Sequence, residues 1–393
     1  MLTKSALNKF FIFVCSISFL YLSYVNIASG LKEQIDIDSV SGYGLQMGYV
    51  VFIISFFLFS LGNTIRKINW PLLLLASYIF ILFLFQQVSL VSALSGIGLL
   101  LWLFSYSMGN RVASCSEEII EYFENILFII TSILTIYVLY FYFNKGFVSY
   151  QMTTDTSFFL IVYLPFLMLY NKKRFIKIVI VFLFIIVCVL SLKRSIVVGL
   201  FVFFVFFIAL SIKKETTHRW YFWLIPVLVI IVAFVLKNSI GEVLALRFSE
   251  TAETGGNGRI EIYTNIIHHY IDSNFTEQIF GHGYRSVRYI NNGLLAHNDF
   301  LQLLYDGGVL GVLLYMALWF FFIRIAIKNW RRRKQFGNVF SVYISTLALY
   351  FILSMMNCFI YSYMLVSPLF LSIGFMIESI NRTNIQKSLI YQI

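Results

Sequence analysis

Three residues, far apart in the sequence, have side chains that could take part in catalysis. Arg194 lies between two apolar stretches, Arg259 opens a short amphipathic stretch, and His297 directly precedes a long apolar one. A histidine can exchange protons near neutral pH, and the helix start that follows it favours an anion. A cation at a membrane boundary needs a partner or an aqueous pocket. Each residue also has a purely structural interpretation, as a snorkelling arginine, a loop arginine and an interfacial histidine.

The elements that must position these residues are long apolar segments. Of the 393 residues, 60% are hydrophobic and 12% are charged, whereas a soluble globular protein carries about 25% charged residues. Apolar stretches of about twenty residues recur along the chain, and each can cross about 30 Å of hydrocarbon as a helix. Helices suit a membrane because they satisfy their backbone polar groups internally. We therefore expect an all-α, polytopic membrane protein. The predicted spans are 8–28, 44–63, 70–87, 89–108, 119–143, 156–171, 175–192, 195–212, 220–238, 300–323, 338–357 and 360–379.

The distribution of basic residues predicts how these twelve spans are oriented. The net charge of +11 does not indicate nucleic-acid binding, because the cations lie in short loops between apolar stretches rather than on one face. With both termini in the cytoplasm, twenty of the 29 Lys and Arg residues fall inside, as the positive-inside rule requires. The remaining nine oppose that bias and are candidates for a functional role. They are Lys32, Lys145, Lys193, Arg194, Lys237, Arg247, Arg259, Arg285 and Arg288.

One long hydrophilic segment, residues 239–299, interrupts the apolar pattern between the ninth and tenth spans. Long ordered loops tend to be functional, and the predicted topology puts this one outside. The chain accordingly divides into three parts. Residues 1–238 hold nine spans, 239–299 form a large periplasmic loop with short helices, and 300–393 hold three spans and a cytoplasmic tail.

Local signals predict helix boundaries around the loop. Gly258 permits an unusual backbone turn, and the apolar pattern after Arg259 predicts a helix of about three turns through Tyr270. Either Asn298 or Asp299 is suited to cap the helix that follows. The small residues within 307–311 would let another helix approach this one closely.

Metal binding and nucleotide-driven chemistry have little support in the sequence. His268 and His269 are adjacent, hence on different faces of a helix, and there is no HxxxH or HxxE arrangement. His282 and His297 could converge only through folding. The chain also has no P-loop and no GxGxxG sequence. We expect no metal ion and no cofactor.

Three sequence motifs follow one another along the chain. They are the basic residue in 191–195, the pair Gly258-Arg259 at the start of a loop helix, and His297-Asn298 followed by Leu301-Gln302-Leu303-Leu304-Tyr305-Asp306-Gly307-Gly308-Val309-Leu310-Gly311. Together and in this order, they resemble the O-antigen polymerase and O-antigen ligase family of bacterial envelope glycan enzymes. The third is the most specific. The resemblance implies a GT-C-like glycosyltransferase architecture and glycosyl transfer from a glycan carried on undecaprenyl pyrophosphate.

The resemblance also implies roles for individual residues. Arg194 and Arg259 would grip the pyrophosphate and stabilise charge on the leaving group. His297 would orient or deprotonate the acceptor hydroxyl as a general base, and no metal is needed if arginines neutralise the diphosphate. Because the first motif reads Lys193-Arg194, either cation could face the site, and we favour Arg194. Further candidates for glycan or phosphate contacts are Arg285, Arg288, Asn298 and Tyr284.

Two enzymes and one transporter fit this pattern. The leading hypothesis is an O-antigen polymerase of the bacterial inner membrane, which joins lipid-linked repeat units on its outer face during lipopolysaccharide biosynthesis. The alternative is an O-antigen ligase that transfers polysaccharide to lipid A core. A lipid-linked glycan flippase is less favoured, because transporters show two related halves and here the halves differ. Expected partners are the lipid-linked donor and acceptor oligosaccharides, with a chain-length regulator as a further candidate.

Overall fold

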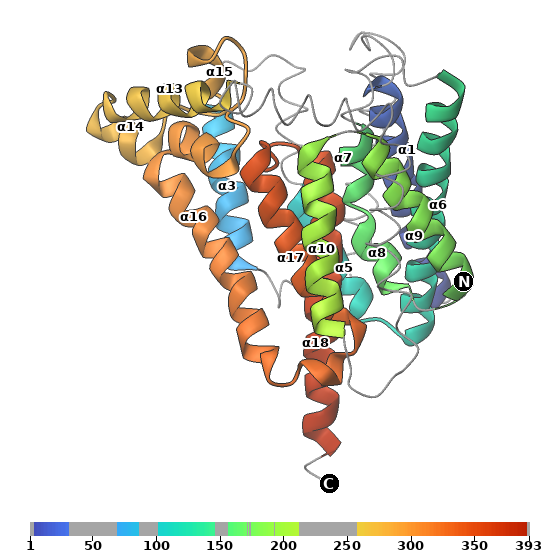
Figure 1. The fold of residues 1–393 in the computed structure, drawn as a ribbon. Helices are drawn as coiled ribbons and strands as arrows, with labels where there is room; N and C mark the ends of the chain where they lie inside the picture. The colour runs from blue at the N-terminus through green and yellow to red at the C-terminus, as the bar shows by residue number, and fades with distance from the viewer. Residues whose placement is uncertain are drawn as a thin grey trace.

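The computed structural model describes residues 4–30, 69–85, 101–145, 156–170, 172, 174–191, 193–211 and 258–390. These residues form helices joined by turns, and none of the described ranges contains a strand (Figure 1). The predicted all-α class is confirmed for them. The predicted spans 44–63 and 220–238, and residues 239–257 of the predicted loop, lie outside the described residues.

The helices before the loop come from the apolar stretches of the first half of the chain. They are α1 (Lys4–Gly30), α3 (Trp70–Leu84), α5 (Leu101–Ala113), α6 (Glu117–Lys145), α7 (Thr156–Ile161), α8 (Leu164–Leu169), α9 (Arg174–Leu190) and α10 (Arg194–Ser211). The helices of the loop and the C-terminal region are α13 (Arg259–Ile271), α14 (Phe275–Phe280), α15 (Val287–Ile290), α16 (Asp299–Trp330), α17 (Asn338–Met356) and α18 (Tyr363–Ile390), with a 3-10 turn at Arg333–Phe336.

Three of these helices are long and apolar enough to cross a membrane: Glu117–Tyr140, Asp299–Trp330 and Asn338–Met356. Shorter apolar helices accompany them at Ser5–Tyr21, Trp70–Leu84, Phe175–Leu190 and Ser195–Ser211, and a further apolar segment, Phe158–Leu169, covers parts of α7 and α8. The chain is thus a multi-pass membrane protein. Helices α13, α14 and α15 gather at one end of the helix bundle, and the N- and C-termini of the chain lie away from them (Figure 1).

The stretch 156–171, predicted as one span, forms two short helices instead. The prediction was wrong because Pro165 stands in the first turn of α8, and a proline ring clashes with the carbonyl four residues earlier. That residue, Ile161, is the last of α7. Residues 160–170 are all buried, and the hydroxyl of Tyr163 shares a hydrogen bond with Ser23 of α1 at 2.6 Å. This stretch is therefore an internal element of the bundle.

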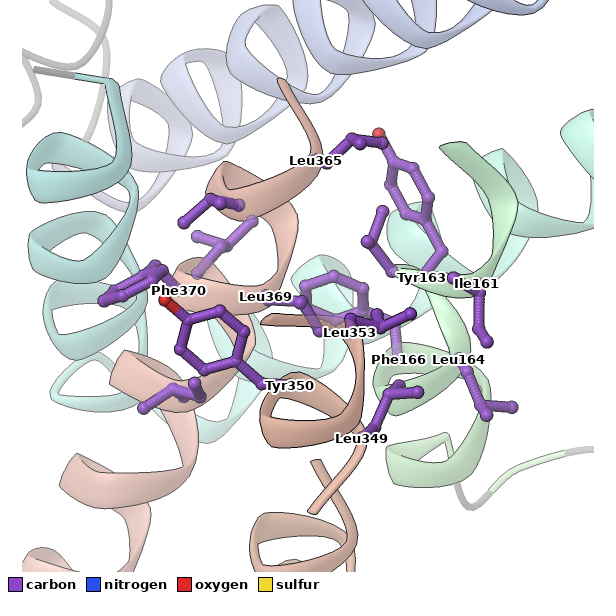
Figure 2. Packing of buried hydrophobic residues seen from close by; sticks show 14 of the residues in the cluster. Ile161, Tyr163, Leu164, Phe166, Leu349, Tyr350, Leu353, Leu365, Leu369 and Phe370 are labelled. Carbon is purple, nitrogen blue, oxygen red and sulfur yellow. The ribbon is translucent and has the colours of Figure 1, made fainter. Parts of the chain in front are cut away.

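The α7–α8 element packs against α17 and α18 in the centre of the molecule. Figure 2 shows Ile161, Leu164 and Phe166 on one side, facing Leu349 and Leu353 of α17. Such a close-packed interior resists displacement of its side chains. The packing holds the ends of α17 and α18, and the turn that joins them, against the remainder of the bundle.

Glycines bring α5 and α18 into backbone contact. A Cβ on Gly109 would lie 2.1 Å from the carbonyl oxygen of Leu371, and a Cβ on Gly374 would lie 2.1 Å from that of Tyr106. Small residues at helix interfaces allow this approach in membranes. Helix α18 continues beyond the predicted span 360–379 to Ile390, so most of the predicted cytoplasmic tail is helical.

Candidate functional site

Helix α13 begins at Arg259 and lies with α14 and α15 at one end of the bundle (Figure 1). Gly258 precedes it with φ 75°, a left-handed conformation that glycine adopts without steric cost. The helix ends at Ile271, one residue after the predicted end. Ile266 anchors it in a small buried cluster with Val287, Ala296 and Tyr305. The predicted helix and the position of Arg259 at its start are confirmed.

His297 lies directly before α16, as predicted, in a conformation that is uncommon for its type. Its φ is 52°, in the left-handed region where a non-glycine residue is under strain. The next residue, Asn298, caps the helix, because its side-chain oxygen accepts from the amides of Phe300 at 2.9 Å and Leu301 at 3.2 Å. Its side-chain nitrogen donates to the carbonyl of Met355 at 3.5 Å. His297 is therefore held at the positive end of a helix dipole.

A tyrosine brings the Arg259 and His297 motifs together. The hydroxyl of Tyr263 donates to the backbone carbonyl of His297 at 3.4 Å. Tyr263 follows Arg259 by four residues, and residues at that spacing lie on the same face of a helix. The face of α13 that carries Arg259 is therefore the face that meets His297.

Asp299 ties the start of α16 to the turn between α17 and α18. It is completely buried, and one carboxylate oxygen accepts from the backbone amides of Phe359 at 2.6 Å and Ile360 at 2.8 Å. The other oxygen accepts from the hydroxyl of Tyr315 at 3.1 Å. Buried charges require such compensating donors. The residue after the His297-Asn298 pair thus fixes that pair against the bundle.

The first motif, residues 191–195, is connected to the same end of the bundle through aromatic contacts. Helix α10 begins at Arg194, whose side chain lies outside the described residues. The ammonium of Lys193 lies 3.8 Å from the ring centroid of Phe158, and that ring is 6.4 Å from the ring of Phe359. Phe359 is a backbone partner of Asp299. These contacts connect the residue before α10 with the start of α16, and which of the two cations faces the site remains a prediction.

Asp306 binds the loop to α16. Its Oδ1 accepts from the Ser286 hydroxyl at 2.8 Å and the Val287 amide at 3.1 Å, and its Oδ2 accepts from the Arg285 amide at 2.9 Å and the Gln302 side chain at 2.6 Å. The residue is completely buried. Four donors on one carboxylate compensate for its removal from water.

Gln302 extends this network toward His297. While its nitrogen donates to Asp306, its side-chain oxygen accepts from the backbone amide of Ala296 at 2.9 Å. Ala296 is fully buried and directly precedes His297. The segment on both sides of His297 is consequently fixed, by Gln302 before it and by the Asn298 cap after it.

Arg285 and Tyr284 occupy different environments. Arg285 has φ 57°, its guanidinium carbon lies 5.2 Å from the Tyr284 ring, and its Nε is buried without a hydrogen-bond acceptor in the described part of the chain. Tyr284 is only 5% exposed, and its ring packs edge-on against Phe83 at 5.5 Å and Tyr361 at 4.7 Å. Packing accounts for Tyr284 in this structure, and its glycan contact stays a prediction.

Arg288 stands apart from the buried groups. Its side chain is exposed, as is that of the neighbouring Tyr289, which is 84% accessible. The structure therefore brings Arg259, His297 and the start of α10 to one end of the bundle, and it leaves Arg288 on the surface there.

The Gly307–Gly311 region contains a break in α16, where the sequence predicted a continuous helix. Gly308 has φ 61° and ψ −166°, which are non-helical values. A Cβ on Gly308 would lie 2.3 Å from the carbonyl oxygen of Ile279, and a Cβ on Gly281 would lie 2.2 Å from that of Asp306. The glycines permit the close approach of another helix, as predicted, because Ile279 lies in the last turn of α14 and Gly281 directly follows that helix. Tyr78 of α3 closes the contact by donating to the carbonyls of Phe280 at 2.9 Å and Gly307 at 2.8 Å.

His282 follows this contact and makes partners of its own. Its Nε2 shares a hydrogen bond with the Ser273 hydroxyl at 2.8 Å, and its ring stacks on Tyr305 with centroids 4.2 Å apart. Burial lowers the pKa of His282 below its usual value, with Glu277 opposing this effect and His269 adding to it. Among the described residues, no group of three His, Cys, Asp or Glu side chains could hold a metal ion.

The sequence interpretation missed Asp299, Gln302 and Asp306, although all three lie in the most specific motif. The signal was available, because an ionisable residue inside an apolar helix marks a functional position by default. What the sequence did not show is their partners, which lie on the loop and on the turn between α17 and α18.

Comparison with known families supports the motif analysis. The family model described as O-antigen ligase matches residues 178–316, a segment that contains Arg194, Arg259 and His297 together with the break in α16. No curated protein matches the chain significantly. The match confirms the resemblance that the three motifs predict: residues 178–316 of this chain are similar to the family described as O-antigen ligase.

Proposed function

We propose that this protein is a glycosyltransferase that moves a glycan from undecaprenyl pyrophosphate to an acceptor hydroxyl on the outer face of the bacterial inner membrane. The observation that carries the proposal is the contact between the Tyr263 hydroxyl and the His297 carbonyl. This contact puts Arg259, one turn before Tyr263, on the face of α13 that meets His297. This arrangement supports a site in which His297 accepts a proton and Arg259 binds phosphate.

In the proposed reaction, the acceptor oxygen attacks the anomeric carbon of the donor sugar. Its proton passes to His297 as general base. The bond between the anomeric carbon and the pyrophosphate oxygen breaks, and its electron pair leaves with undecaprenyl pyrophosphate. Arg259 and Arg194 bind that leaving group, where charge-assisted hydrogen bonds stabilise the negative charge that develops. Arginines supply the neutralisation here, without a step that requires a metal ion.

The acceptor defines two versions of this proposal. A polymerase would use a second lipid-linked repeat unit, and this was the leading hypothesis from the sequence. A ligase would use lipid A core, and the family model that matches the chain carries the description O-antigen ligase. That description supports the ligase at least as well as the polymerase.

The lipopolysaccharide banding pattern of a deletion strain tests both versions. Loss of a polymerase would leave single repeat units on the lipid A core. Loss of a ligase would leave long chains stranded on the lipid carrier. A deletion strain with unchanged lipopolysaccharide and no accumulated lipid-linked glycan would contradict glycosyl transfer altogether.

Substitutions in the site sharpen this test. We expect His297→Asn to lower polymer or ligation product by about 100-fold, because a positioned base contributes about 10² or more, while asparagine tolerates the positive φ of this position. Arg259→Ala should have a similar effect at normal protein abundance. Arg331→Ala, which removes an exposed arginine after the far end of α16, is the matched control and should retain activity. Full activity in both site variants would exclude the proposed chemistry.

A further inference from the structure

The exposed side of α13 carries an apolar stripe that the buried contacts of the helix do not use. Ile260, Ile267 and Ile271 are spaced by seven and four residues, which puts them on one face. They are 62%, 43% and 62% exposed. Ile266, the buried anchor of the helix, lies on an adjacent face at 0% exposure. The apolar surface of α13 is therefore wider than its contact with the protein.

A neighbouring exposed face of α13 is polar. Glu261, His268 and Asp272 are all exposed, and helical spacing puts them together, away from Ile266. The helix thus has a side that suits water and a side that is apolar and still uncovered. This division is typical of helices that lie in a membrane interface.

Helix α14 extends the apolar stripe. Phe275 is 76% exposed and Phe280 is 51% exposed. In Figure 1, α13 and α14 project sideways beyond α16 at their end of the bundle. Phe275 and Phe280 therefore belong to a helix that projects beyond the packed bundle.

The apolar surface at the end of α14 adjoins exposed apolar side chains at the end of α3. Along α16, a row of exposed apolar side chains follows helical spacing over the whole membrane-crossing segment. The row consists of Val309, Leu313, Met316, Phe320, Ile323 and Ile327. On α3, Ile81 and Phe85 are 47% and 86% exposed. With Phe280, they line a cavity of about 380 Å³ beneath the loop after α14. The exposed apolar surface at the end of α3 is thus continuous with that of α14.

We propose that α13 and α14 form an interfacial element, with Ile260, Ile267, Ile271, Phe275 and Phe280 immersed in the outer leaflet of the bilayer. The partner of this surface is the lipid itself, because the surface is continuous with the exposed apolar side chains at the end of α3. Moving such apolar side chains from water into lipid is favourable. The element would fix the height of Arg259, which opens α13, relative to the lipid surface.

Site-directed spin labelling tests this surface without any assay of activity. In a background whose four native cysteines are replaced, we would label Ile267→Cys, Ile271→Cys and Phe275→Cys in proteoliposomes. The lipid-side control is Leu313→Cys, and the water-side control is Asp272→Cys. Collision rates with oxygen, which concentrates in lipid, and with a water-soluble nickel complex report the surroundings of each label.

We expect the three test positions to favour oxygen several-fold over nickel, relative to Asp272→Cys, and to approach the ratio at Leu313→Cys. A nickel accessibility equal to that at Asp272→Cys would overturn the proposal, as it would place the stripe in water. Exclusion of both reagents would also overturn it, because it would show that protein covers the stripe.

A second measurement uses the unaltered protein. Phospholipids with a photoreactive diazirine high in the acyl chain should label peptides from residues 259–280 as well as peptides from α16. Labelling of α16 peptides alone would contradict an immersed stripe. Because neither experiment depends on glycosyl transfer, their outcome is independent of the proposed function.

Discussion

The carboxylate of Asp306, buried in α16, accepts the backbone amide hydrogen of Arg285 at 2.9 Å. The same carboxylate accepts from Ser286 and Val287, so one side chain of a membrane helix sets the path of three loop residues. Arg285 has φ 57°, a strained value that persists only where surrounding contacts enforce it. The position of the Arg285 guanidinium, whose carbon lies 5.2 Å from the Tyr284 ring, therefore depends on Asp306.

Removing the Asp306 carboxylate should destabilise the loop. Asp306→Ala leaves four donors without their acceptor, and a buried unsatisfied donor costs about 1–3 kcal/mol. We expect a clear fall in the thermal unfolding midpoint in detergent, together with faster trypsin cleavage after Arg285 and Arg288. Ser286→Ala removes one donor and leaves three hydrogen bonds to Asp306 in place, so its effect should be about 1 kcal/mol. Equal behaviour of the two variants would show that Asp306 does not organise the loop.

The backbone contact between the loop and the break in α16 predicts the effect of adding a single methyl group. Gly281→Ala would put a Cβ 2.2 Å from the Asp306 carbonyl oxygen, which must move backbone atoms as well as strain a positive φ. We expect a loss of unfolding free energy above about 3 kcal/mol.

The matched control is Gly293→Ala, which has φ 84° but no atom within 4 Å of the added Cβ. It should cost only the conformational strain of about 1–2 kcal/mol. Chemical denaturation of both variants, followed by a far-ultraviolet circular dichroism signal, measures the difference. A larger loss in Gly293→Ala would contradict the close approach at Gly281.

Asp299 should matter for activity through the position of His297. Asp299→Ala removes the acceptor for the amides of Phe359 and Ile360 and frees the start of α16 from the bundle. We expect loss of stability by about 3 kcal/mol or more and loss of glycosyl transfer.

Tyr315→Phe keeps both backbone contacts of Asp299 and removes one hydroxyl donor at 3.1 Å. Its cost should be about 1 kcal/mol, with activity largely retained. Parallel measurement of melting midpoint and product formation in the two variants separates these outcomes. Full activity in a well-folded Asp299→Ala protein would refute the positioning role.

The lowered pKa of His282 predicts a pH-dependent stability. A histidine whose folded pKa lies below its unfolded value binds its proton more weakly when folded, so folding is favoured by the neutral form. This contribution is fully present above the unfolded pKa of about 6.5 and is lost as the pH falls toward the folded pKa. The melting midpoint of the wild type should therefore fall over this range more than that of His282→Gln. Parallel pH profiles of the two proteins would contradict the effect of burial on His282.

Several local features of the site could be predicted from the sequence because they depend on nearby residues. The start of α13 after Gly258 and the cap of α16 at Asn298 are examples, since a cap bonds to amides only two or three positions ahead. The split at Pro165 was equally local, but the apolar composition of the stretch concealed it. The break at Gly308 was not predictable in this way, because its cause is contact with Ile279 from the loop.

The sequence alone determined that the chain is helical, that it belongs in a membrane, and which three motifs could carry chemistry. Hydrophobic periodicity and charge placement report the solvent around each segment, and that information is contained in consecutive residues. Only the tertiary structure showed that Asp299 binds the turn between α17 and α18 and that Asp306 binds the loop before α16. Their donors, Phe359 and Ser286, lie 60 and 20 residues away. Nothing in a linear pattern specifies which distant backbone or side-chain donor will satisfy a buried carboxylate.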